Sequence, residues 1–264
     1  MTMDEIRDRV GEGVRHGVEQ ARHAEAELVA NVRKGLSRAE RDLSDGLQRW
    51  RLYRMNHPVR GLMDAGAAIT FLGLFAWLLS KARPWATQIP LVVYGISVVG
   101  LFVVSSLYHS VPWRPVWRGR MRRLDHTMIF VLVAGTYTPV AVLVLDGWVR
   151  VATLAAVWSI TAVGGFQKFV MHTGNRLSIS LQVLQGWMAL LLLGPLLARL
   201  PVQAVALIVG GGLLYTIGMV ALVTRRPFLW PRFFSYHEVF HVFVIAAATL
   251  HFVMIARYVA VPAA

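Results

Sequence analysis

The chain has 264 residues, of which 56% are hydrophobic and only 16% are charged, and it contains no cysteine. Disulfides and thiolate metal sites are therefore excluded, and the charged fraction lies well below the roughly 25% of ordinary soluble domains. The net charge of +13 would suit a nucleic-acid-binding protein, but the basic residues stand in short clusters between apolar runs. This pattern is typical of a polytopic membrane protein with basic loops, and we expect no nucleic-acid partner.

Residues 1–54 form a separate, densely charged segment with ten acidic and eleven basic residues. Apolar residues recur in it about every 3.6 positions from Val10 to Trp50, which predicts an amphipathic helix with a single apolar stripe. Two interpretations stay open. The helix packs on its own protein or on another copy, or it lies on the anionic inner leaflet as an interfacial helix.

Residues 55–264 contain seven segments that are long and apolar enough to cross a bilayer, which requires about 20 apolar residues. These segments are Gly61–Leu79, Ile89–Tyr108, Leu124–Leu145, Val151–Gln167, Ile179–Leu197, Val202–Val223 and Tyr236–Val259. We therefore predict an all-α protein, with a seven-helix transmembrane bundle in residues 55–264 after the amphipathic helix of residues 1–54.

Lysine and arginine are unequally shared between the two sides of the predicted bundle. Fourteen of them lie either between Arg49 and Arg60, just before the first span, or in the loops after spans two, four and six, whereas the opposite side has five. Loops rich in lysine and arginine remain in the cytoplasm. The distribution predicts a multi-pass cell-membrane protein with a cytoplasmic N-terminus and an outside C-terminus.

Several polar side chains stand inside or at the ends of these spans, where ionisable groups are costly and are candidates for function. The second span ends with Ser105 and His109, one helical turn apart. The third begins with Asp125, and the seventh begins with His237 and His241, which share one helix face. Because the spans alternate in direction, all five residues are expected at the cytoplasmic end of the bundle.

Three imidazoles from two helices predict a metal site, and Zn²⁺ is the natural candidate in a chain without cysteine. Three protein ligands leave a fourth position for water, as in catalytic zinc sites. Asp125 would accept a proton from that water or hold it through a hydrogen bond, and Ser105 would orient it or stabilise an oxyanion. In the simpler interpretation, His109 reaches the interface and Asp125 pairs with Arg122 or Arg123.

Two further ionisable residues lie within the spans. Asp64, near the start of the first span, is expected to line the cavity or to pair with Arg60 at the i,i+4 spacing. His251 lies about 15 Å beyond His241 along the same helix. We expect His251 to be packed in the bundle or to lie near the outer interface.

Four motifs follow one another along the chain. They are Ser105-Ser106-Leu107-Tyr108-His109, Leu124-Asp125-His126, Ala134-Gly135-Thr136-Tyr137-Thr138-Pro139, and Tyr236-His237-Glu238-Val239-Phe240-His241 with His251-Phe252 after it. In this order they resemble the bacterial hemolysin III proteins, which belong with the progestin and adipoQ receptors, the adiponectin receptors among them. The resemblance covers about Gly61 to the C-terminus. The family's usual Glu-x-x-Asn-x-x-x-His pattern in the first span is not matched by the stretch from Val59 to Gly66.

The resemblance implies seven transmembrane helices, an inward N-terminus and a zinc ion held near the cytoplasmic face by His109, His237 and His241. It also implies a relation to membrane hydrolases that include alkaline ceramidases, and hence a zinc-dependent hydrolysis of lipid amides or esters with Asp125 and Ser105 as catalytic residues. Alternatives are a membrane-disrupting cytolysin, which the family name implies, and a receptor or membrane-homeostasis sensor with a structural zinc. Membrane lipids are the expected partners, while the substrate and the oligomeric state stay open.

Overall fold

A computed structural model describes residues 3, 22–23, 25–43, 57–82, 85–171, 175–227, 229–230 and 234–260. The chain divides into two units, Met1–Arg54 and Met55–Ala264. In the first unit, residues 3, 22–23 and 25–43 are helical, and Leu28, Val32 and Leu36 of the predicted apolar stripe are exposed. The rest of the predicted amphipathic helix lies outside the described residues, and its place at a membrane interface stays a prediction.

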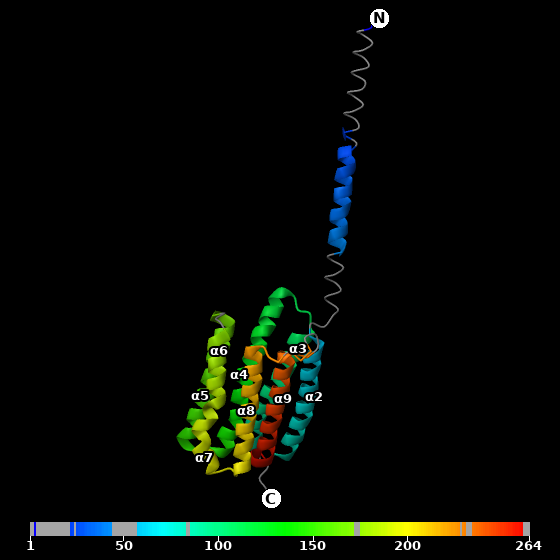
Figure 1. The fold of residues 1–264 in the computed structure, drawn as a ribbon. Helices are drawn as coiled ribbons and strands as arrows, with labels where there is room; N and C mark the ends of the chain where they lie inside the picture. The colour runs from blue at the N-terminus through cyan, green and yellow to red at the C-terminus, as the bar shows by residue number, and fades with distance from the viewer. Residues whose placement is uncertain are drawn as a thin grey trace. The chain divides into compact units, whose positions relative to one another are not determined.

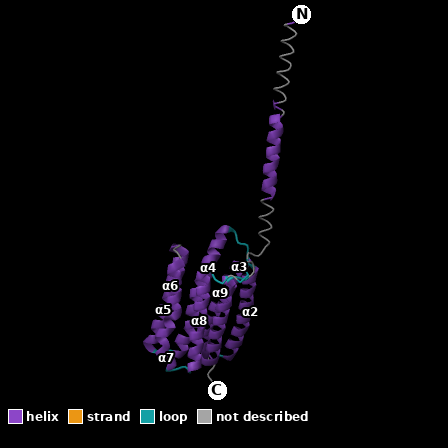
Figure 2. Ribbon diagram, in the orientation of Figure 1, coloured by secondary structure: helices purple, strands orange, loops and turns teal. Residues whose placement is uncertain are grey.

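The described part of the second unit is built from helices (Figures 1 and 2). The α-helices are α2 (Pro58–Lys81), α3 (Trp85–Ser110), α4 (Pro115–Val144), α5 (Gly147–Phe166), α6 (Asn175–Trp187), α7 (Leu193–Leu197), α8 (Val202–Thr224) and α9 (Tyr236–Ile255). Two π-helical segments, η1 (Gln167–Met171) and η3 (Ala256–Ala260), extend α5 and α9, and a 3₁₀ segment, η2 (Met188–Leu192), joins α6 to α7.

These elements make seven helical stretches long and apolar enough to cross a membrane, which confirms the predicted all-α seven-helix architecture. The third stretch starts at Pro115, nine residues before the predicted Leu124, because the arginine-rich segment is helical although it is too polar to be part of a span. The fifth is interrupted by η2, just before Pro195. Proline has no N–H to donate to the carbonyl four residues earlier, so the regular helix is disturbed there.

Close packing brings α2, α3, α4 and α9 together. The Phe71 ring on α2 stacks on Phe102 of α3 at a centroid distance of 5.5 Å and meets Phe252 of α9 edge-on at 6.3 Å. A Cβ at Gly135 of α4 would lie 2.1 Å from the Ser97 hydroxyl of α3, so the small residue permits the close approach of these two helices. The end of α3 and the start of α9 are thereby held at the same end of the bundle.

Candidate metal centre

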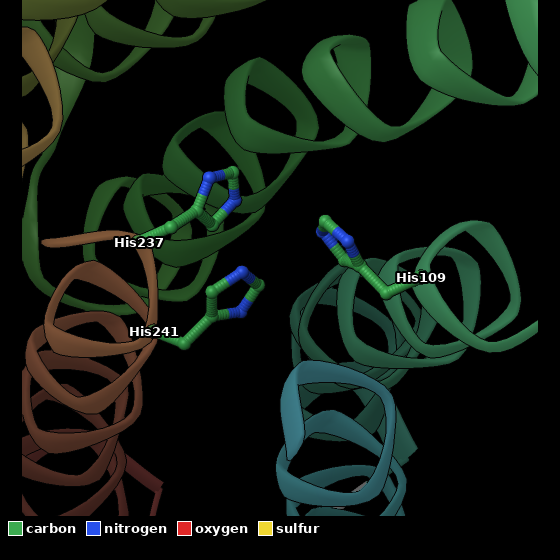
Figure 3. Close-up of side chains that lie close together, drawn as sticks. All are labelled: His109, His237 and His241. Carbon is green, nitrogen blue, oxygen red and sulfur yellow. The ribbon is translucent and has the colours of Figure 1, made fainter. Parts of the chain in front are cut away.

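Three histidines lie together where α3 ends and α9 begins, with their rings turned toward a common space (Figure 3). His109 comes from α3, and His237 and His241 come from successive turns of α9. One ring nitrogen of each lies within 4.8 Å of the others, and the ring centroids are 5.1 to 5.2 Å apart. His109 and His241 are buried and His237 is half-buried. The structure thus brings the three predicted ligands into a cluster that could hold one metal ion.

The first turn of α9 is anchored by the carboxylate of Glu238. Its Oε2 accepts hydrogen bonds from the backbone N–H of Ser235 at 2.8 Å and from the Ser235 hydroxyl at 2.9 Å. Its Oε1 accepts a hydrogen bond from Arg60 Nε of α2 at 2.7 Å. An acidic side chain that caps the helix start in this way stabilises the first turn. The two histidines of α9 therefore project from a turn that is tied to both its own cap and α2.

Asp64 of α2 is fully buried and contacts one of the three histidines. Its Oδ1 accepts a hydrogen bond from Nδ1 of His241 at 2.9 Å. Nε2 of His241 is buried and has no hydrogen-bond partner within the described ranges. A histidine that donates one ring N–H to a carboxylate and keeps the other nitrogen free is in the tautomer that binds metals. The donor set therefore fits a metal ion.

The sequence suggested only that Asp64 lines the cavity or pairs with Arg60. In the structure it does line the cavity, but Arg60 pairs with Glu238 and Asp64 pairs with His241. The sequence did indicate that Asp64 is a functional candidate, because a carboxylate inside an apolar span is costly, but it did not indicate which residue Asp64 contacts.

Ser105 and Asp125 line the same cavity as the histidines of α9. Ser105 is 5% exposed and lies one turn before His109 on α3. The Asp125 side chain is 13% exposed, and its Oδ2 is 3.5 Å from Nδ1 of His126. Among the residues that the structure describes, no ion pair joins Asp125 to either of its arginine neighbours on α4. The carboxylate is thus available to the cavity.

The cavity itself has a volume of about 550 Å³ and extends from the histidine cluster into the bundle. Its walls come mainly from α3, α4, α6, α8 and α9, with Asp64 added by α2, and are mostly apolar, with Leu101, Ile129, Val183, Val209 and Val244 among the lining residues. This volume is in the usual range for sites that bind small molecules. An apolar cavity with polar groups at one end is suited to a hydrocarbon chain that carries a polar head.

His57, just before α2, adds a fourth imidazole beside the cluster. Its backbone N–H donates to the carbonyl of His109 at 3.0 Å, and the two ring centroids are 6.1 Å apart. Burial, assisted by the guanidinium groups of Arg60 and Arg118, lowers the pKa of His57 below its usual value of 6.5. This imidazole is therefore neutral at pH 7 and places no further positive charge beside the three histidines.

Most of the chain is similar in sequence to known proteins. A family profile described as "Haemolysin-III related" matches residues 52–252, a range that includes all three clustered histidines. Hemolysin-3 of Bacillus cereus is 30% identical over 182 residues, which are 68% of this chain and 80% of that protein. The Hemolysin-3 homolog of Bacillus subtilis (strain 168) is 30% identical over 200 residues, 75% of this chain and 89% of the relative. The human Monocyte to macrophage differentiation factor is 24% identical over 184 residues, 63% of this chain and 68% of that protein.

Proposed function

Because the chain belongs to the haemolysin-III related family and is an integral membrane protein with a buried three-histidine cluster, we propose that it is a zinc-dependent hydrolase of lipid amides or esters. The observation that carries the proposal is the buried Nε2 of His241, which has no hydrogen-bond partner among the described residues and is held in place by Asp64 beside two further imidazoles. This cluster stands at the end of an apolar cavity large enough for part of an acyl chain.

The donor set favours zinc, because three neutral imidazoles without a thiolate are a common catalytic zinc shell. His109, His237 and His241 would hold the ion, and Asp64 would keep His241 in the required tautomer and orientation. When bound, zinc supplies Lewis acidity, which makes a water easier to deprotonate and polarises a carbonyl.

The remaining chemistry belongs to the side chains of α3 and α4. The Asp125 carboxylate takes a proton from the water whose oxygen bonds to the substrate's carbonyl carbon, and it returns the proton to the leaving amine or alcohol as the bond to carbon breaks. The Ser105 hydroxyl donates a hydrogen bond to the oxygen on which negative charge develops. The apolar walls hold the acyl chain and exclude bulk water from the reacting group.

We place this site at the cytoplasmic face of the membrane. The proposal is supported by the distribution of lysine and arginine, because from Arg49 onward fourteen lie on the side of the cluster and five on the other. The C-terminus would then lie outside the cytoplasm. A reporter enzyme that is active only outside the cytoplasm should therefore be active when it is fused after Ala264. If a fused reporter were instead active only in the cytoplasm, the orientation of the chain would be the reverse of the one proposed, and the site would lie at the outer face.

The function is tested by release of fatty acid from ceramides and acyl-ester lipids by the purified, zinc-loaded full chain. We expect product from the native chain and none from the variant His237→Ala/His241→Ala, measured by mass spectrometry. A zinc-loaded chain that is inert on all of these lipids would exclude the hydrolase. In that case leakage of a dye from lipid vesicles would favour a cytolysin, and intact vesicles would favour a sensor with a structural zinc.

A further inference from the structure

The cavity has a second polar end, formed by Tyr215 of α8 and His251 of α9, both of which line it. His251 follows His241 by ten residues, which is about 15 Å along the helix axis. It is 8% exposed, and its ring lies 5.6 Å from that of Tyr215 between centroids. The cavity therefore offers polar groups at two places, with apolar wall between them.

Two polar atoms at this second end have no hydrogen-bond partner among the described residues. Nε2 of His251 is 3.2 Å from the carbonyl oxygen of Ile208. A carbonyl only accepts, so Nε2 carries the proton, and Nδ1 of the neutral imidazole is left as an acceptor. In the part of the chain that the structure describes, neither this Nδ1 nor the Tyr215 hydroxyl has a hydrogen-bond partner, although both atoms are buried. Buried polar atoms are nearly always hydrogen-bonded, so a group inside the cavity is expected to satisfy them.

The His251 ring is held in a fixed place by α8. A Cβ at Gly211 would lie only 2.3 Å from Nε2 of His251, so the glycine makes the room in which the imidazole lies. The Ile208 carbonyl, about one turn earlier on the same helix, sets the orientation of the ring. The acceptor Nδ1 of His251 is thus held in one orientation beside Tyr215, and preorganisation reduces the entropy lost when a ligand binds.

We propose that Tyr215 and His251 bind a hydroxyl group on the hydrocarbon chain of a lipid whose carbonyl lies at the histidine cluster. A hydroxyl matches both atoms, because it donates to Nδ1 of His251 and accepts from the Tyr215 O–H. A keto oxygen can only accept, and a methylene group can do neither. The pair therefore selects acyl chains with a mid-chain hydroxyl. The inference rests on the proposed function only for the position of the carbonyl.

Binding of three fatty acids to the full chain in detergent tests this inference. Stearic acid, a mid-chain ketostearic acid and a mid-chain hydroxystearic acid differ only in the group that would face the pair. The hydroxy acid should bind about ten- to a hundredfold more tightly than stearic acid, because it satisfies buried polar atoms that stearic acid leaves unpaired. The keto acid should bind with intermediate affinity. Equal affinities for all three acids would overturn the inference and leave these atoms to a resident water.

Variants then assign the preference to the pair. Tyr215→Phe should remove most of the preference for the hydroxy acid. Tyr137→Phe is the matched control, because Tyr137 also lines the cavity but its hydroxyl already donates to the Gly186 carbonyl at 2.9 Å. An unchanged preference in Tyr215→Phe would contradict the assignment.

The same measurement separates this inference from the proposed hydrolysis. In His237→Ala/His241→Ala, which removes two of the three clustered imidazoles, the preference for the hydroxy acid should persist because the second polar end is intact. If the native chain shows the preference but hydrolyses no lipid, the hydroxyl site stands and the hydrolase fails. If it hydrolyses lipids without any preference, the hydroxyl site fails and the hydrolase stands.

Discussion

Six of the seven membrane-spanning stretches fall into two groups that differ in the share of their apolar stretch that is buried inside the protein, and α2 lies between the groups at 28%. The apolar stretches of α3, α4 and α9 are 50%, 44% and 50% buried, whereas those of α5, of α6 with α7, and of α8 are each 22% buried. The first group carries all five predicted site residues, and α6 and α8 of the second group complete the cavity wall. Reactive geometry requires side chains locked by their surroundings. The site is thus built on the helices whose positions are most constrained by packing.

The largest effect is expected from the ligands on the buried helices. His237→Ala/His241→Ala should abolish stoichiometric zinc binding, because a single remaining imidazole is not a zinc shell. Metal analysis of the purified chain measures this. Gln182→Leu, a buried cavity residue on α6, is the matched control and should retain zinc. Full occupancy in the double variant would show that the cluster is not the site.

The next effect concerns the proton carrier on α4. Asp125→Asn keeps the shape of the side chain but removes the base, so turnover of a lipid amide should fall by about 10²–10⁴-fold. Zinc content should stay near that of the native chain, since Asp125 is not among the three clustered ligands. Native turnover in a zinc-loaded Asp125→Asn protein would remove this carboxylate from the mechanism.

A smaller effect is expected at Ser105 of α3. Ser105→Ala should lower turnover by about 10–10³-fold if the hydroxyl contributes one hydrogen bond to the developing oxyanion. Its neighbour Ser106 gives a control, because the Ser106 hydroxyl donates to the Gly61 carbonyl of α2 at 2.8 Å and serves packing. Ser106→Ala should therefore change thermal stability and leave turnover per zinc unaltered. Equal losses of turnover in the two variants would assign Ser105 to packing as well.

The smallest effect is expected at Asp64 of α2. Only 28% of the apolar stretch of α2 is buried, but the helix positions His241 through the Asp64 carboxylate. Asp64→Asn should weaken zinc binding by about 10–100-fold, the usual consequence of losing a carboxylate behind a ligating histidine. Competition with a chelator measures this affinity in folded protein, so a general loss of structure can be recognised separately. Unchanged affinity would mean that Asp64 does not orient His241 for metal binding.

The sequence by itself determined the seven spans and the residue types of the candidate metal centre. A run of about 20 apolar residues is a local property that the bilayer requires of each helix separately, and the i,i+4 spacing of His237 and His241 places both on one face without any tertiary contact. The meeting of His109 with this pair also followed from the alternation of the spans, which puts the end of α3 and the start of α9 on one side.

Only the tertiary structure decided which polar groups pair with one another. Asp64 had a local partner available in Arg60, but it contacts His241, from which 177 positions separate it, while Arg60 is taken by Glu238. Likewise, nothing in the sequence joins His251 to Tyr215 or to the cavity. Spans in a membrane are apolar on every side, so hydrophobic periodicity does not reveal how each helix is rotated about its axis. That rotation is set by packing between helices, and it determines which side chains reach the site.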